Sequence, residues 1–252
     1  MTANLPESLA DSWRAKGNRT GESSVLLASI TAETTVFEPT DPADGLEAAA
    51  GSEIPVRSLF TVDLSISPSL SSLGIDPDSA LEKAAPKARS QFVDTLESEG
   101  LRVDETRNTL EFEAANGNEG VWFVFDVAYP LATAVDEADD TGADENESAE
   151  PPRIDAEGHI AVWPLESTLG MAGGVLPLEG LDAASVGAVD GAAGADETPV
   201  ANGGVPAADD DVVPAFDVDP ERDRETIASL VRTIEPVAAD STDADGDENE
   251  DE

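Results

Sequence analysis

Alternation of hydrophobic and polar positions predicts strands in the first two thirds of the chain. Every second residue from Leu26 to Val36 is apolar or threonine, and the same period recurs from Val56 to Ile66. A period of two is typical of a strand with one buried face. Residues 109–127 alternate on both sides of the sequence NGNEG, which predicts a hairpin, and residues 157–163 predict a further strand ended by a proline.

Two other segments have the spacing of short amphipathic helices. Leu5, Leu9 and Trp13 recur at every fourth position before Gly17, which predicts a helix near the N-terminus. Residues 219–236 begin with Asp-Pro, a common helix start. The apolar residues of this second segment follow a helical stripe: Ile227, Leu230, Val231 and Ile234.

The strongest helical pattern covers residues 76–100. Asp76 is a favourable N-cap, Pro77 occupies the first helical position, and Gly100 suits the position after the helix end. Pro86 lies inside the pattern and is expected to kink the helix or to split it in two. One face carries a stripe of Leu81, Ala84, Ala85, Ala88, Phe92 and Leu96.

The order of these elements favours an α+β fold. The hairpin and the alternating faces indicate an antiparallel or mixed sheet of about five to six strands, packed by two main helices. No internal apolar run approaches the length needed to cross a bilayer.

Charge divides the chain into segments that can and cannot form a core. Residues 132–152 carry eight acidic side chains and no Lys or Arg, and the last 16 residues are similarly acidic. Such segments bury too little apolar surface to offset the entropy of ordering, so they are predicted to be disordered insertions and a disordered tail. A single α+β domain is predicted from residues 1–131, 153–178 and 217–236, with disordered segments at 132–152, 179–216 and 237–252.

The overall charge indicates a salt-adapted protein. Lys and Arg number 13 against 55 Asp and Glu, which gives a net charge of −42. Concentrated salt screens the resulting self-repulsion, and the acidic surface keeps a protein soluble there. The competing interpretation is an ordinary acidic protein rich in disorder. No basic stripe is present, so nucleic acid is not expected as a partner, and membrane insertion is not expected either.

Several chemistries are disfavoured by the residues present. The chain has no cysteine, which excludes disulfides and thiolate sites, and its single histidine, His159, is not accompanied by a recognisable triad or zinc motif. No phosphate-binding glycine motif occurs. We therefore expect no cofactor, assign no catalytic or metal-binding residue, and regard an enzyme as the less favoured class. The N-terminus lacks the apolar segment of a signal peptide, so a cytoplasmic location is expected.

Residues 156–177 (AEGHIAVWPLESTLGMAGGVLP) are the one stretch with two competing interpretations. After Pro164 the glycines suit a connecting loop that packs its apolar side chains on the sheet. Alternatively, the loop is an apolar contact surface at the sheet rim, for an unknown protein or a small apolar ligand. The residues of that candidate contact site are His159, Trp163, Leu169, Met171 and Val175.

Two resemblances accompany these patterns. The order of elements resembles that of the PsbP-like sandwich, a fold used mostly by non-enzymatic binding and assembly proteins. The stretches at 59–74, 158–164, 170–174 and 219–235 resemble an uncharacterised haloarchaeal protein family, which implies no activity.

The function therefore stays unknown at this level, with three classes open. A non-enzymatic interaction or binding domain of a halophilic cytosol is the main hypothesis. A chaperone-like or solubilising protein that acts through its acidic segments is an alternative, and a carboxylate- or metal-dependent enzyme is another. A buried carboxylate cluster in a cleft would favour the enzyme, and an exposed apolar groove would favour the binding domain.

Overall fold

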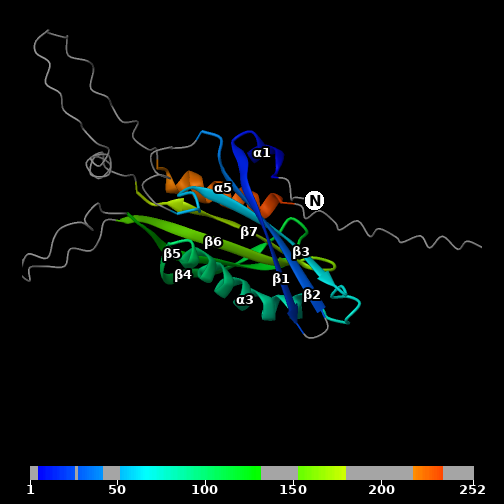
Figure 1. Ribbon diagram of the computed structural model, residues 1–252. Coiled ribbons are helices and arrows are strands. Elements are labelled where there is room, and N and C mark those ends of the chain that lie inside the picture. Colours follow the sequence, from blue (N-terminus) through cyan, green and yellow to red (C-terminus); the bar gives the residue numbers. More distant parts are fainter. Residues whose placement is uncertain (1–4, 26–27, 42–51, 132–152, 180–217, 235–252) are drawn as a thin grey trace, which may run out of the picture.

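The computed structural model contains one antiparallel sheet with helices on both faces (Figure 1). It describes residues 5–25, 28–41, 52–131, 153–179 and 218–234. The strands are β1 (Trp13–Val25), β2 (Ala28–Pro39), β3 (Ser58–Ser67), β4 (Arg102–Glu113), β5 (Glu119–Pro130), β6 (Arg153–Pro164) and β7 (Leu169–Pro177). The helices are α1 (Glu7–Ala10), α3 (Pro77–Ser98) and α5 (Pro220–Thr233).

Two meanders meet in the middle of this sheet. The strand order is β1-β2-β3-β7-β6-β5-β4, and every neighbouring pair is antiparallel. Helix α3 connects β3 to the far edge strand β4, from which the chain returns strand by strand to pair β7 with β3. The α+β class with an antiparallel sheet is thus confirmed, but the predicted number of five to six strands is wrong, because the sheet has seven.

Each face of the sheet buries a separate core. Helix α3 covers one face, where Phe92 packs between Phe60 and Phe125 with ring centroids 5.4 and 5.6 Å apart. Helix α5 lies on the opposite face, as Figure 1 shows, and buries Leu230 completely. The apolar stripe predicted in residues 219–236 therefore packs against the sheet, as its helical periodicity implies.

The glycine-rich stretch after Pro164 is a central strand rather than a loop. Strand β7 pairs with β3 on one side and with β6 on the other. A side chain at Gly173 would collide with the backbone carbonyl of His159, and one at Gly174 would collide with that of Ser58. Glycine is therefore required here by close approach of neighbouring backbone, which local sequence rules assign to turns.

The N-terminal prediction is also corrected. The helix expected over residues 5–13 is a four-residue turn of helix, and Trp13 begins the 13-residue edge strand β1. This strand contains two glycines and four charged residues, so its hydrophobic alternation is weak. Its strand conformation depends instead on antiparallel pairing with β2 along its whole length.

The long helix follows its sequence signals closely. The Asp76 side chain accepts hydrogen bonds from the backbone N–H groups of Asp78 and Ser79, and Gly100 adopts a φ of 90° after the helix end. Pro86 does not split the helix, since α3 is continuous from Pro77 to Ser98. The predicted hairpin turn is confirmed as well, with Gly117 at a φ of 79° between β4 and β5.

Some predictions fall outside the part of the chain that the structure describes. These are the proposed disordered segments at 132–152, 179–216 and 237–252, apart from Glu179. Strands from both sides of residues 132–152 belong to the same sheet. Among the described helices, none has the length and apolar character needed to span a bilayer.

We expect Phe125→Ala to lower the free energy of unfolding by about 2–5 kcal/mol, because Phe125 is 1% exposed between two core rings and its removal leaves a cavity. Leu110→Ala is the control, because Leu110 is 44% exposed. Chemical denaturation in constant salt measures both. Equal stability of the two variants would contradict the placement of Phe125 in the α3-side core.

Candidate functional site

The residues of the apolar contact site expected from the sequence are not brought together. Leu169, Met171 and Val175 point to the α3 side of the sheet, whereas Trp163 and His159 belong to the α5 side. All except Met171 are at most 5% exposed, and Met171 is partly buried. The sheet itself separates the two groups, because successive residues of a strand face opposite sides.

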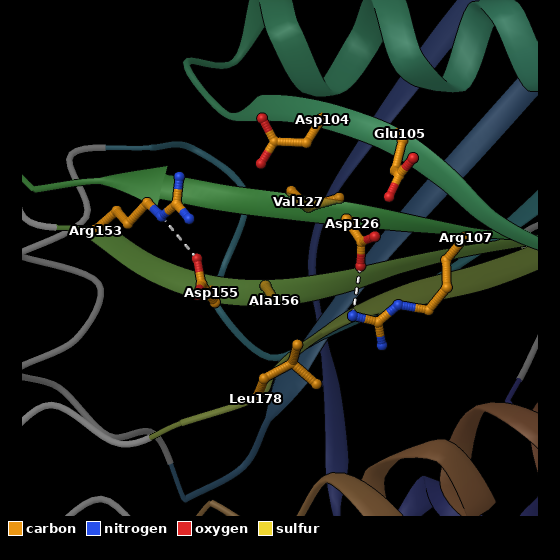
Figure 2. Close-up of a pocket in the computed structure, with 9 residues that line it drawn as sticks. All are labelled: Asp104, Glu105, Arg107, Asp126, Val127, Arg153, Asp155, Ala156 and Leu178. Atoms are coloured by element: carbon orange, nitrogen blue, oxygen red, sulfur yellow. Dashed lines mark ion pairs between the residues drawn. The ribbon is translucent and has the colours of Figure 1, made fainter. Parts of the chain in front are cut away.

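A cavity of about 340 Å³ lies elsewhere, at the end of the sheet where β5 finishes and β6 begins (Figure 2). Charged side chains from β4, β5 and β6 form most of its wall, and Leu178 closes one side after β7. The lining residues are Asp104, Glu105, Arg107, Asp126, Val127, Arg153, Asp155, Ala156 and Leu178.

Two irregularities of the edge strand β4 shape this wall. The pairing of β4 with β5 shifts between Val103 and Glu105 and again between Thr106 and Asn108. Each shift leaves one residue of β4 without a partner, first Asp104 and then Arg107, and both line the cavity. Bulges of this kind redirect side chains and also protect an edge strand from pairing with another molecule.

Ion pairs hold most of these side chains in place. Arg107 Nη2 lies 2.5 Å from Asp126 Oδ1, and Arg153 Nε lies 2.9 Å from Asp155 Oδ1. Asp104 accepts a hydrogen bond of 2.7 Å from Arg102, outside the cavity wall. Glu105 makes no ion pair with any described residue. The wall therefore contains four carboxylates and two guanidinium groups, a net charge of −2.

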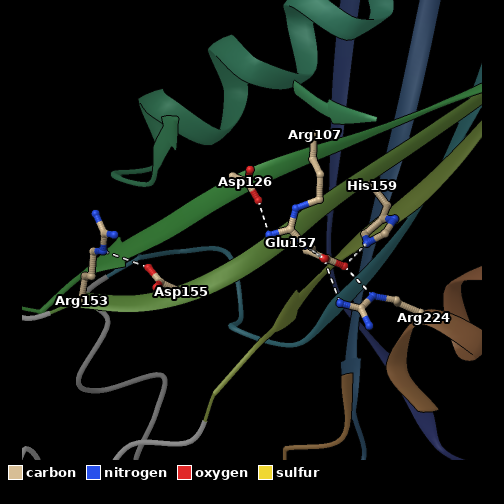
Figure 3. A network of polar contacts seen from close by, with 7 residues as sticks. All are labelled: Arg107, Asp126, Arg153, Asp155, Glu157, His159 and Arg224. Atoms are coloured by element: carbon tan, nitrogen blue, oxygen red, sulfur yellow. Dashed lines mark hydrogen bonds and ion pairs between the residues drawn. The ribbon is translucent and has the colours of Figure 1, made fainter. Parts of the chain in front are cut away.

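Beneath the cavity, Arg107 reaches a buried carboxylate (Figure 3). Glu157 on β6 has a side chain only 3% exposed and contacts Arg107 through Oε1. It also accepts two hydrogen bonds from Arg224 of α5, at 2.7 and 2.9 Å. A buried carboxylate without such partners would be strongly unfavourable, so the two arginines make its burial possible.

The single histidine completes this buried group. His159 Nε2 lies 3.3 Å from Glu157 Oε2, and the imidazole ring packs edge-on against Trp122 with centroids 5.9 Å apart. Within the described residues, both ring nitrogens of His159 and the indole Nε1 of Trp122 are buried without hydrogen-bond partners. His159 is thus part of a polar cluster on the α5 side rather than the edge of an apolar pocket.

Electrostatics keep Glu157 ionised. Burial by itself raises the pKa of Glu157, but contacts with His159 and Arg224 outweigh burial and hold the pKa at about 2. A second buried acid on α5, Asp223, lies 2.8 Å from Arg57 Nε, and there burial prevails and raises the pKa of the carboxyl group. Two ionic contacts therefore fasten α5 to the sheet in addition to its apolar stripe.

The chemistry available in the cavity is ionic. Among the described residues, its wall offers no hydroxyl, imidazole, amine or thiol group, and its four carboxylates are exposed or half-buried rather than a buried cluster. In the described part of the chain, no three His, Asp or Glu side chains are grouped as metal ligands. The arrangement suits recognition of charge by carboxylates at fixed positions.

Sequence reasoning missed this site because its residues look like an ordinary solvated surface. The segment RVDETRN (102–108) mixes both charge signs and lacks a clear period of two, which was the available signal for a bulged edge strand. Two of the ten arginines of this acidic chain, Arg107 and Arg153, line the cavity, but their convergence depends on the pairing of three strands.

We expect Glu157→Gln to weaken the acid dependence of stability. Since the pKa of Glu157 is lowered from 4.5 to about 2 by folding, its ionised form stabilises the fold above about pH 4.5, and this contribution is lost as the pH falls towards 2. Urea denaturation between pH 6 and 2 should show a shallower decline for this variant than for the parent. The exposed Glu111→Gln on β4 is the control, and identical slopes in all three proteins would contradict the assignment.

Comparison with known proteins gives a family without an assigned activity. A family model described as "Domain of unknown function (DUF6517)" matches residues 7–235. No curated protein and no solved structure matches the chain. The matched range contains every strand of the sheet, the cavity and the buried Glu157 cluster.

Proposed function

We propose that this chain, which belongs to the family of unknown function, is a non-catalytic binding domain. The charged cavity is its binding site. The observation that carries the proposal is the wall itself, where bulged residues of β4 meet ion-paired residues of β5 and β6 around about 340 Å³. A volume of this size suits a small molecule or a single long side chain.

The charges of the wall favour a cationic occupant. Both terminal nitrogens of Arg107 face protein carboxylates, and Arg153 is paired with Asp155. The carboxylate of Glu105, by contrast, has no ion-pair partner among the described residues. A ligand with an ammonium or guanidinium group would offset part of the net charge of −2, and one with two such groups would neutralise it; charge-assisted hydrogen bonds to carboxylates would fix its position. This differs from the apolar ligand considered from the sequence.

Titration with putrescine, a small diamine, tests the proposal, with the dicarboxylate glutarate as the oppositely charged probe. The full chain is observed by NMR at the lowest KCl concentration that keeps it folded, so that salt screens the contacts least. We expect putrescine to shift the amide signals of residues 104–107 and 153–156 in a saturable manner. Glu105→Gln should weaken binding about fivefold, a change of about 1 kcal/mol.

The matched control is Glu111→Gln, which removes the same charge from an exposed position on the same strand, outside the cavity. Its affinity for putrescine should equal that of the parent. Binding of glutarate at these signals in place of putrescine would refute the cationic class and retain the site. Absence of binding by either probe would refute the cavity as a site for charged ligands.

We also propose that the protein is adapted to concentrated salt and works in a halophilic cytosol. Support comes from the net charge of −42 and from only three lysines among 13 basic residues. We further propose a likeness in architecture to the PsbP-like sandwich, which the antiparallel sheet with helices on both faces supports. That likeness would concern architecture and supplies no ligand.

The salt proposal predicts that the melting temperature rises as KCl increases from about 0.1 M to 3 M, because the screening length falls from about 10 Å to less than 3 Å. Calorimetry or circular dichroism at constant pH measures the change. Sodium sulfate at lower concentration serves as a comparison, since it strengthens burial of apolar surface in most proteins. A melting temperature that does not respond to KCl would contradict salt adaptation.

A further inference from the structure

The cavity and helix α5 share one side chain, and from this we infer that Arg107 couples the state of the cavity to the docking of α5. Arg107 lines the cavity, where its Nη2 pairs with Asp126. Its Nη1 donates to Glu157, the carboxylate that holds Arg224 of α5. Figure 3 shows Arg107 above Glu157 and Arg224 below it, on the side of α5.

The burial of Glu157 makes this link energetically significant. Its side chain is 3% exposed while α5 is docked, so each cationic partner offsets part of the cost of keeping a carboxylate away from water. When α5 leaves the sheet, Glu157 loses this cover and water can solvate it. Arg107 therefore stabilises the docked state more than the released state, and its removal shifts the balance towards release.

Helix α5 is suited to local release. It is the last helix that the structure describes and is separated from β7 by residues 180–217 of the sequence. Among the described elements, the one that α5 contacts most is β7. Among the described residues, its attachment includes one apolar stripe, the Arg224–Glu157 contact and the Asp223–Arg57 contact. Local opening of such an element costs less than global unfolding.

Release of α5 would expose its own apolar stripe and the sheet residues that it covers. On the helix, Ile227, Leu230 and Val231 are at most 1% exposed, and so are Leu59 and Leu176 of the sheet in the same core. A molecule in the cavity that changes how Arg107 divides its two terminal nitrogens between Asp126 and Glu157 therefore changes access to this surface. The inference goes beyond the proposed function, because the coupling exists whether or not a ligand has been identified.

Hydrogen exchange of the unliganded full chain tests the coupling by mass spectrometry. In Arg107→Gln we expect amides of residues 220–233 to exchange at least about tenfold faster, whereas amides of α3 keep the rate of the parent. Arg107→Lys keeps the charge but cannot reach two carboxylates with one planar group, so its α5 amides should exchange at an intermediate rate. This second variant also serves if Arg107→Gln does not fold.

Arg102→Gln is the matched control, since Arg102 lies on the same strand in an exposed ion pair with Asp104 and does not reach Glu157. Its α5 amides should exchange as in the parent. Unchanged exchange of α5 in both Arg107 variants would overturn the inference, and so would an equal acceleration of α3 and α5, which would indicate a global loss of stability. Because no ligand is used, this failure is distinct from a failure of putrescine to bind.

Discussion

The close approach of three backbones at Gly173 and Gly174 is the constraint on which the rest of this structure depends. Strand β7 joins the β1–β3 meander to the β4–β6 meander, and at these positions any side chain would collide with a neighbouring strand. An added Cβ at Gly174 would also lie 3.2 Å from Ile227 of α5. The glycines therefore allow both the continuous sheet and the close seating of α5 upon it.

The seating of α5 in turn explains why an acidic residue can be buried in the middle of β6. Glu157 and His159 lie on the α5 side of the sheet, beside Leu176 and Gly174 of β7. Without the helix, this position would be an ordinary solvated carboxylate. With the helix in place, Arg224 of α5 and Arg107 of β4 both contact Glu157. This shared carboxylate links the cavity wall to the helix through ion pairs.

Local rules recovered the elements whose signals are contained in their own sequence. The Asp76 cap, the stripe of α3, the Gly117 turn and the alternation of β5 all depend on neighbours within a few residues. Strand β7 was missed because its glycines are required by the close approach of β3 and β6, and no local sequence pattern encodes those contacts. The cavity was missed for the same reason, since Arg107 and Asp155 converge only through the register of three strands.

Several of the scarce basic residues of this chain join different elements of the fold. Arg14 joins β1 to Glu38 of β2, Arg19 joins β1 to Glu99 after α3, and Arg57 joins the start of β3 to α5. The Arg57–Asp223 contact is largely buried, with side chains 16% and 7% exposed, so salt screens it far less than it screens separated surface charges. Salt can therefore screen the repulsion among the 55 acidic side chains of the chain while the buried Arg57–Asp223 contact persists. An arginine placed where two elements meet stabilises both of them, and Glu157 of β6 receives two, Arg107 from β4 and Arg224 from α5.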